Sequence, residues 1–246
     1  MGLTASGSPF APPGLATSDP AGARAFYTAL LGWRAETRPG GPSGSYTILS
    51  DAEGEAAILY RQTEEARRAR VAPHWSSYVR VEEADAVAQR ARELGAAVLR
   101  EPANVADTGR MATLREPSGA IVTLWQPRRP ANGGMCWNEL TTPDVEAAAA
   151  FFSGLLGWNY EIGSSGYRTI VGAGEPAGAI RERNDAPADW LTYFPVESAE
   201  GAARVAETLG GRRLAPVEHS QFGRAALIAD PQGAAFGVFE NPRSNR

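Results

Sequence analysis

The hydrophobic and polar positions in residues 135–239 predict a fixed order of secondary structure. Apolar residues recur at helical spacing between Asp144 and Gly157 and again between Ala199 and Gly210, and a glycine closes each stretch. Short runs separated by turns predict strands over residues 135–141, 160–162, 167–171, 177–181, 191–196, 212–214, 224–229 and 235–239. The predicted order is one strand, one helix and three strands, twice over.

The first half of the chain carries the same landmarks in the same order. Residues 26–33 (FYTALLGW) return as residues 151–158 (FFSGLLGW), and residues 116–120 (EPSGA) return as residues 230–234 (DPQGA). Between them, Gly109-Arg110 returns as Gly223-Arg224. Each repeat is longer than a solenoid unit, so the repeats are whole domains in tandem.

We therefore expect two domains, residues 8–127 and residues 133–242, joined by a linker rich in proline, arginine, asparagine and glycine. Each domain should consist of two βαβββ modules. Helices that cover one face of mostly antiparallel strands make the expected fold class α+β.

The landmarks resemble those of one known superfamily. In both halves an aspartate precedes a phenylalanine by seven residues, Asp19 before Phe26 and Asp144 before Phe151, and Leu-Gly-Trp and a late acidic-Pro-x-Gly turn follow. This arrangement is similar to the vicinal oxygen chelate superfamily, which contains glyoxalase I, bleomycin-resistance proteins and extradiol dioxygenases. The segment that starts at Trp137 is most similar to a tandem-domain bacterial branch labelled glyoxalase-like. The resemblance implies that the strands of each domain curl around an open cleft that holds the ligand.

Composition narrows the range of partners. The chain has 24 basic and 28 acidic residues, a net charge of −4, and no separate basic stripe, so nucleic acid is not an expected partner. Cys136 is the only cysteine, which excludes an internal disulfide and favours a reducing cytoplasm. The start of the sequence lacks the pattern of a signal peptide, and no apolar stretch reaches membrane-spanning length. We expect a cytoplasmic protein with no membrane partner.

The resemblance also implies where the metal-dependent members bind a divalent ion. Those positions hold Trp137, Leu191 and Gly237 in the second domain and Pro12, Ser76 and Thr123 in the first. A divalent metal needs His, Asp, Glu or Cys donors, usually three from the protein. The two histidines, His74 and His219, stand in different halves, so no His pair is expected within one domain. We therefore expect no metal and no other cofactor.

Strand parity gives the expected lining of the clefts. The ligand-binding candidates are mainly aromatic residues at cleft-facing positions: Trp137, Thr141, Leu191, Arg224 and Phe239 in the second domain, and Tyr78 and Trp125 in the first. Aromatic walls with small residues between them fit a flat, largely apolar aromatic molecule. The alternative is that these aromatic side chains only fill the core.

Glu139 is the sharpest catalytic candidate. A carboxylate at a cleft-facing position beside Trp137 should be partly desolvated, which suits it to general acid or base chemistry. The other catalytic candidates are Tyr193 and His219, as hydrogen-bond partners of a ligand. The alternative for Glu139 is a structural ion pair with Arg224 or Arg181. Since Gly14 stands at the equivalent position of the first half, the second domain is the better candidate for chemistry.

Three functions follow from these observations. The first is a metal-independent enzyme or accessory protein that acts on an aromatic, natural-product-like molecule by acid and base chemistry, such as an isomerase, a lyase or a tailoring oxygenase. The second is a protein that sequesters a drug or metabolite, and the third, a metal-dependent glyoxalase or dioxygenase, lacks the expected donors. We expect the two domains to pack against each other within one chain, as a monomer or a homodimer.

Overall fold

The computed structural model describes residues 8–40, 44–128, 137–163, 166–172, 175–220 and 223–240. Contacts divide the described chain into two compact units. The first unit comprises residues 8–11, 76–128 and 137–191, and the second comprises residues 12–75 and 192–240. Each unit therefore combines one module from each sequence repeat.

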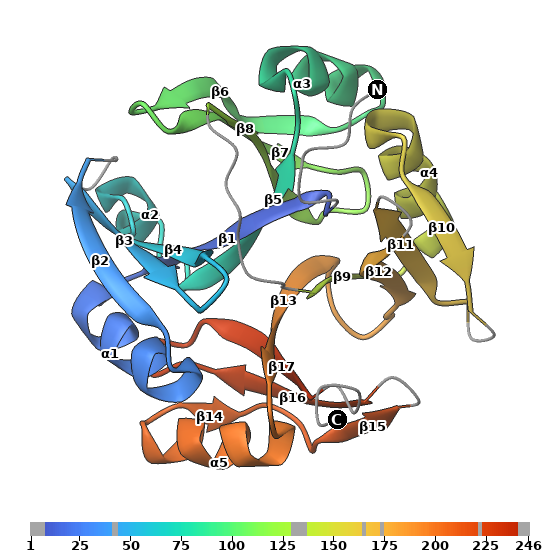
Figure 1. Cartoon of the computed structure of the whole chain (residues 1–246). Helices are drawn as coiled ribbons and strands as arrows, with labels where there is room; N and C mark the ends of the chain where they lie inside the picture. Colours follow the sequence, from blue (N-terminus) through green and yellow to red (C-terminus); the bar gives the residue numbers. More distant parts are fainter. Residues whose placement is uncertain are drawn as a thin grey trace. The chain divides into compact units, whose positions relative to one another are not determined.

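The first unit contains two helices that pack side by side, α3 (Ala84–Glu93) and α4 (Val145–Leu156) (Figure 1). One set of neighbouring strands runs β5 (His74–Arg80), β8 (Ile121–Pro127), β7 (Gly109–Arg115) and β6 (Ala97–Val105). The other runs β10 (Asn159–Ile162), β11 (Arg168–Gly172), β12 (Glu175–Glu182) and β9 (Trp137–Thr142). In each set one pair is parallel, β5 with β8 and β12 with β9, and the other pairs are antiparallel.

The second unit repeats this plan with α1 (Pro20–Leu31) and α5 (Ala199–Thr208), which also lie side by side (Figure 1). One set of strands runs β2 (Arg34–Pro39), β3 (Ser45–Ser50), β4 (Glu55–Arg61) and β1 (Phe10–Thr17). The other runs β13 (Asp189–Val196), β17 (Ala235–Glu240), β16 (Gly223–Ala229) and β14 (Arg212–Arg213). Strands β1, β5 and β13 have residues in both units.

The element order predicted from the sequence is confirmed, with two additions. A short helix, α2 (Glu64–Arg68), follows β4, and a short strand, β15 (Glu218–Ser220), pairs with β16. All three residues of β15 are exposed, so no apolar alternation marks this strand in the sequence. The α+β fold class and the four repeated modules stand as predicted.

The repeated motifs mark the ends of the first helix in each half. The Asp19 side chain accepts a hydrogen bond from the Gly22 amide at 3.1 Å, and the Asp144 side chain accepts one from the Ala147 amide at 2.9 Å. Each aspartate thereby accepts a hydrogen bond from a backbone N–H that has no partner within the helix. The glycines of the two Leu-Gly-Trp motifs adopt left-handed conformations, with φ of 68° and 70°, which end α1 and α4.

Each unit has one hydrophobic core, and each core takes residues from both repeats. The first core combines the alanine face of α3 with Phe152 and Leu155 of α4 and with Trp158 and Trp190. The second core includes the following residues: Phe26, Tyr27, Trp33, Trp75, Phe194 and Phe236. Neither repeat alone supplies a complete core of this kind.

The second core contains a buried polar chain that the first lacks. The Trp75 indole Nε1 donates to the Tyr27 hydroxyl at 2.9 Å, and this hydroxyl donates to the Asp230 carboxylate at 3.1 Å. Burial raises the pKa of Asp230, while backbone amides of its own turn oppose the shift. In the first unit Phe152 occupies the position of Tyr27, and the buried Trp190 Nε1 has no hydrogen-bond partner among the described residues.

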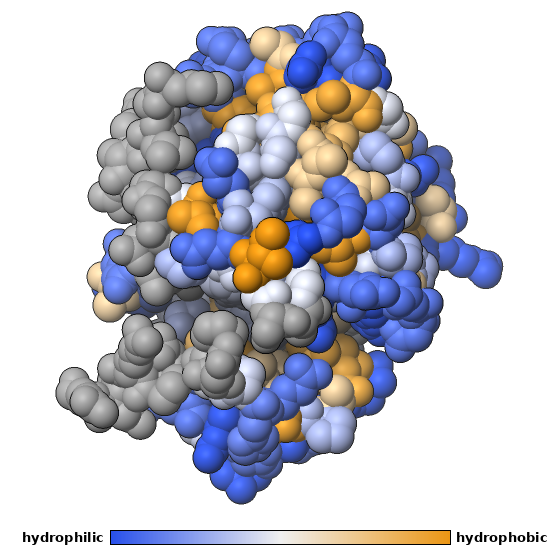
Figure 2. Space-filling model, turned by 90° about the vertical axis from the view of Figure 1, so that its right-hand side faces the viewer, coloured by the Kyte–Doolittle hydropathy of each residue, from blue (hydrophilic) through white to orange (hydrophobic). Residues whose placement is uncertain are grey.

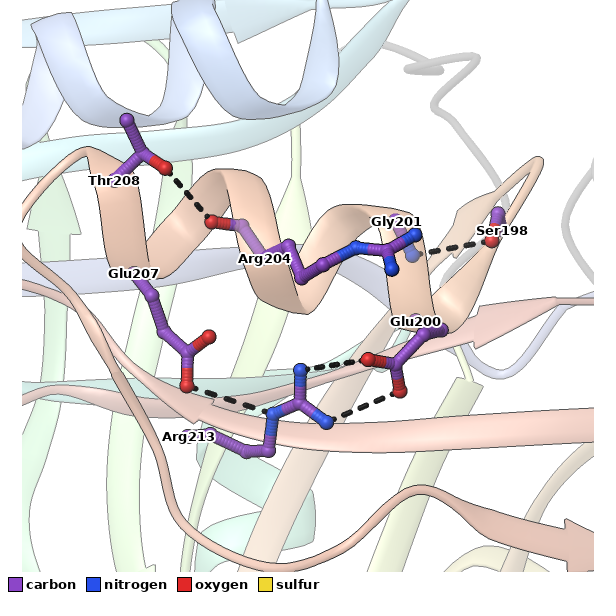
Figure 3. A network of polar contacts seen from close by, with 7 residues as sticks. All are labelled: Ser198, Glu200, Gly201, Arg204, Glu207, Thr208 and Arg213. Atoms are coloured by element: carbon purple, nitrogen blue, oxygen red, sulfur yellow. Dashed lines mark hydrogen bonds and ion pairs between the residues drawn. The ribbon is translucent and has the colours of Figure 1, made fainter.

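Ion pairs on the outer helices also differ between the units. Arg213 contacts two acidic side chains of α5 (Figure 3). Its terminal nitrogens lie 3.0 Å from the two carboxylate oxygens of Glu200, and its Nε lies 3.5 Å from Glu207 Oε1. The hydrogen bonds from Arg213 lower the pKa of Glu200. In the first unit the equivalent acid, Asp85, instead binds Arg110, at 2.5 and 2.8 Å.

Exposed hydrophobic residues occur in separate places. On the face drawn in Figure 2, apolar residues (orange) form small groups between polar ones (blue). The large exposed apolar side chains in the described chain are Val71, Leu99, Ile121, Ile162, Val205 and Leu214. In the part of the chain that the structure describes, every helix is too short or too polar to cross a bilayer.

Candidate functional site

Glu139 lies at the centre of a polar cluster in the first unit. It stands on β9 and is buried, with 8% of its side chain exposed. The Arg181 Nε of β12 lies 2.7 Å from Glu139 Oε1, and the Tyr167 hydroxyl donates to Glu139 Oε2 at 3.0 Å. The Trp137 side chain, also on β9, is a hydrogen-bond partner of Tyr167. We call these four residues the Glu139 cluster.

Strand register brings the cluster together. Strands β9 and β12 run parallel, so that Glu139 faces Ala179 and Thr141 faces Arg181. From the position opposite Thr141, the long arginine side chain reaches back to the carboxylate two residues earlier on β9. Tyr167 comes from the turn before β11, which pairs with the other edge of β12. Three segments of one half therefore meet at a single buried carboxylate.

The electrostatics of the cluster fix the role of each group. Burial raises the pKa of Tyr167 well above its usual range, and the charge of Glu139 adds to the shift. Tyr167 is therefore a neutral hydroxyl at any physiological pH, and it acts as a donor to Glu139. Arg181 keeps its charge under all such conditions and has 34% of its side chain exposed. Both partners favour an ionised Glu139, which accepts hydrogen bonds or a proton.

The ion pair with Arg181, expected from the sequence as the alternative for Glu139, is present. The cluster is nonetheless more than one ion pair, because a tyrosine and a tryptophan complete it. The Thr141 hydroxyl, another ligand-binding candidate, points to the Asp189 carbonyl oxygen at 3.4 Å. Leu191 is half-buried at the end of the same unit.

The first-domain candidates Tyr78 and Trp125 lie together in the first unit. Their ring centroids are 6.3 Å apart, and Tyr78 is buried. The Trp125 ring lies so close to Gly109 that a Cβ there would come within 2.7 Å of it. The second unit has the same arrangement, since a Cβ at Gly223 would come within 2.9 Å of the Phe239 ring. The repeated glycine is explained by this close packing under an aromatic ring.

Tyr193 is buried in the second unit, where it covers Gly237, one of the positions that the family resemblance assigns to a metal. A Cβ at Gly237 would lie 2.0 Å from the Tyr193 ring, so the glycine leaves the space that the ring fills. The two residues face each other across β13 and β17. The structure thus gives Tyr193 a packing role, and its predicted hydrogen bond to a ligand stays a prediction.

His219 and Arg224 meet in the second unit, opposite each other on β15 and β16. With Ser220, Gly223 and Glu240 they line a surface hollow of about 230 Å³. The Glu240 Oε1 lies 4.0 Å from the Arg224 Nη1, while its Oε2 accepts a hydrogen bond from the Ala199 amide at the start of α5. The other histidine, His74, is exposed, and its Nδ1 lies 2.9 Å from the Ala72 carbonyl oxygen.

The predicted site residues thus fall into two groups. Glu139, Trp137, Thr141, Leu191, Tyr78 and Trp125 belong to the first unit, and Tyr193, His219, Arg224 and Phe239 belong to the second. Sequence reasoning missed Tyr167. Its only signal is a tyrosine at the start of a predicted strand, and the register that carries it to Glu139 cannot be read from one sequence.

The residues at the family's metal positions do not fit a divalent ion. Trp137, Leu191 and Gly237 offer no side-chain donor, and the ring of Tyr193 fills the space above Gly237. In the first repeat the same positions offer only the hydroxyls of Ser76 and Thr123, which are poor ligands. Within the described ranges no three His, Cys, Asp or Glu residues come together.

The chain belongs to the glyoxalase/bleomycin resistance protein/dioxygenase superfamily. The model of that superfamily matches residues 10–124, and the model of a glyoxalase-like domain matches residues 136–239. The two matches follow one another along the chain and coincide with the two sequence repeats. The superfamily expected from the motifs is therefore confirmed.

Several known proteins are similar over almost the whole chain. The "Putative glyoxylase CFP32" of Mycobacterium tuberculosis is 31% identical over 92% of this chain and 92% of that protein. The anthracycline biosynthesis protein DauV of Streptomyces sp. (strain C5) is 30% identical over 92% of this chain and 90% of that protein. The Mn(II)-bound glyoxalase from Novosphingobium aromaticivorans shares the fold, with a TM-score of 0.64, 15% identity and coverage of 95% of this chain and 82% of that one.

Proposed function

We propose that this protein acts on a flat, hydroxylated aromatic small molecule, with Glu139 as the proton acceptor and without a resident divalent metal. The observation that carries the proposal is the Glu139 cluster: a buried carboxylate that Arg181 and Tyr167 hold in place and that stands beside Trp137. An acidic O–H or C–H of the ligand gives its proton to the carboxylate, and the same carboxylate returns it to another ligand atom, as in an isomerisation. The protein then needs no redox partner.

Two further observations support the proposal. The donor set at the family's metal positions does not fit a metal, which favours a polarising group that the protein itself supplies. A charged arginine next to the general base supplies one, because a guanidinium stabilises negative charge that develops on a nearby oxygen. One of the similar proteins is named for anthracycline biosynthesis. We take the compound class in that name, a planar aromatic ring system with hydroxyl groups, as the proposed ligand class of this chain.

Sequestration of such a molecule is the second candidate function, and one observation favours it. Both Glu139 oxygens already have a partner, so the carboxylate is well placed as a fixed acceptor for a ligand hydroxyl. A binding protein needs this contact and an aromatic wall, and nothing more. The two candidates differ only in whether the proton leaves the ligand.

Glu139→Gln separates them, because the amide keeps the shape and loses the basic group. The probe is 1,4-dihydroxyanthraquinone, whose binding is followed by fluorescence quenching and whose conversion is followed by chromatography. For an enzyme, Glu139→Gln lowers turnover by roughly 10²–10⁴-fold and affinity only slightly. For a binding protein, only affinity falls, by about 3- to 30-fold. Glu161→Gln, an exposed glutamate on β10 of the same unit, is the matched control.

Metal independence has its own test. Elemental analysis after dialysis against a chelator should find less than stoichiometric zinc, iron, nickel or manganese, and probe binding should be unchanged. One retained equivalent of any of these metals, required for binding or turnover, would overturn this part of the proposal. A probe that binds equally well to wild type and to Glu139→Gln would overturn the assignment of the site.

A further inference from the structure

The surface hollow beside His219 lies on a row of three polar side chains in the second unit. Strand register places His219 of β15 opposite Arg224 of β16, and Arg224 opposite Glu240 of β17. All three residues line the hollow, which has a volume of about 230 Å³. The hollow shares no residue with the Glu139 cluster.

The first unit has an equivalent row, which consists of Asn104 on β6, Arg110 on β7 and Gln126 on β8. The third residue has the same structural role in both rows. Gln126 accepts a hydrogen bond from the Ala84 amide at the start of α3, as Glu240 accepts one at the start of α5. The central arginines of the two rows are therefore counterparts.

In the first unit the protein itself supplies the carboxylate that binds the central arginine. The Nε and Nη2 of Arg110 donate to the two carboxylate oxygens of Asp85, on α3, at 2.5 and 2.8 Å. The Arg110 Nη1 also donates to Asn104 Oδ1 at 3.4 Å. The arginine of this row thus has room for a carboxylate that accepts two parallel hydrogen bonds.

In the second unit the same helix position holds Glu200, but its carboxylate binds a different arginine. Both Glu200 oxygens accept hydrogen bonds from Arg213 at 3.0 Å (Figure 3). Strand register makes Val98 the counterpart of Arg213, so the first unit has an apolar residue where the second has this competing cation. In the described chain the nearest carboxylate contact of Arg224 is with Glu240, at 4.0 Å, and 53% of the Arg224 side chain is exposed.

We propose that this hollow binds a small carboxylate between Arg224 and His219. The two oxygens of the ligand take the place at Arg224 that the Asp85 carboxylate takes at Arg110. A ring N–H of His219, directly opposite Arg224, is a further donor. Because Glu240 places negative charge close to Arg224, a singly charged carboxylate suits the hollow better than a doubly charged phosphate. The site adds a ligand to the protein beyond the molecule proposed for the Glu139 cluster.

NMR titration of the isotope-labelled full chain with butyrate, and with the neutral amide butyramide, tests the proposal. Butyrate should bind and butyramide should not, and the shifted amide signals should centre on His219, Arg224 and Glu240. Arg224→Gln should weaken butyrate binding about tenfold or more, the scale for losing a hydrogen bond to a charged group. His219→Ala should weaken it about threefold or more. Arg204→Gln, at an exposed position of α5 in the same unit, should leave binding unchanged.

The double variant Arg213→Val/Glu200→Asp is the most specific test, because it gives the second unit the residues that surround the equivalent arginine of the first. The released carboxylate should pair with Arg224 and weaken butyrate binding about tenfold or more. Glu240→Gln keeps the acceptor at the start of α5 and removes the negative charge beside Arg224. This variant should therefore strengthen butyrate binding by roughly two- to fivefold.

The proposal is overturned if butyrate does not bind, if butyramide binds equally well, or if Arg204→Gln weakens binding as much as Arg224→Gln. It is also overturned if the double variant, folded like wild type by circular dichroism, binds butyrate as tightly as wild type does. Weaker butyrate binding by Glu240→Gln would contradict the placement of the ligand charge at Arg224.

Discussion

In the first unit a buried glutamate, Glu139, stands on β9 between an arginine and a tyrosine; at the equivalent position of β1, in the second unit, stands Gly14. Strand register extends the comparison, because Tyr167 corresponds to Tyr46 and Arg181 corresponds to Tyr60. Of these three polar residues, the tyrosine is kept, the arginine is replaced by a tyrosine and the glutamate is replaced by a glycine. Duplication preserved the scaffold, while the polar groups that could carry chemistry diverged.

The hydrophobic cores differ in the opposite sense, because here the second unit has the additional polar contacts. The second unit joins Trp75, Tyr27 and Asp230 by hydrogen bonds, whereas the first unit has Phe152 at the place of Tyr27 and leaves the Trp190 N–H without a partner in the described chain. An unsatisfied buried donor costs about 1–3 kcal/mol. At this tryptophan position, the unit that carries the buried charge cluster is the one whose core leaves a donor unsatisfied.

Separating the two repeats should have the largest effect. Each hydrophobic core takes side chains from both repeats, so residues 8–127 alone and residues 133–242 alone each lack part of both cores. We expect neither fragment to unfold cooperatively by itself, and we expect the two fragments to regain cooperative unfolding when mixed. Circular dichroism during heating measures this. Two fragments that each melt cooperatively as monomers would show that the sequence repeats are independent folding domains.

Truncation of the buried carboxylate should have the next largest effect. Glu139→Ala leaves Arg181 and Tyr167 without their shared acceptor, and because Arg181 is one-third exposed we expect a loss of roughly 2–4 kcal/mol in unfolding free energy. Urea denaturation measures it. The double variant Glu139→Ala/Arg181→Met should recover much of the loss, since no uncompensated charge remains. A single variant as stable as wild type would mean that the cluster contributes nothing to the fold.

Substitutions at the equivalent positions Tyr27 and Phe152 should change the unfolding free energy in opposite directions, by smaller amounts. Tyr27→Phe leaves the Trp75 N–H and an Asp230 oxygen without their partner, and should cost about 1–3 kcal/mol. Phe152→Tyr offers a hydroxyl to the Trp190 N–H and should stabilise the protein by up to about 1 kcal/mol. Both are measured by urea denaturation. If the two substitutions change stability in the same direction, the comparison of the cores is wrong.

The smallest effect concerns pH. Burial raises the pKa of Asp230 above its usual 3.8, so the folded protein holds this proton more tightly than the unfolded chain does. The stabilisation from Asp230 is therefore complete below pH 3.8 and is lost as pH rises through the folded-state pKa. Relative to Asp230→Asn, which does not titrate, wild type should lose stability over that range. A difference that is flat with pH, or that grows with it, would contradict the shift.

Much of the fold could be predicted from the sequence, because helices and turns depend on local signals. Asp144 and Gly157 bound α4 as expected, and the predicted helix from Ala199 matches α5 to within one residue. The interleaving of the repeats could not be predicted, since a sequence period says nothing about which modules share a core. Strand parity and charge were enough to predict Glu139 as a site residue and Arg181 as one of its two possible ion-pair partners. The contact of Tyr167 with Glu139 depends on a strand register that only the structure provides.

A crystal structure of the protein with 1,4-dihydroxyanthraquinone tests the central claim most directly. We predict that a phenolic oxygen of the probe lies within hydrogen-bond distance of a Glu139 carboxylate oxygen, and that the ring system lies against Trp137 with no metal ion between them. A probe bound beside Gly14, Tyr46 and Tyr60 instead, with the Glu139 cluster untouched, would contradict the account.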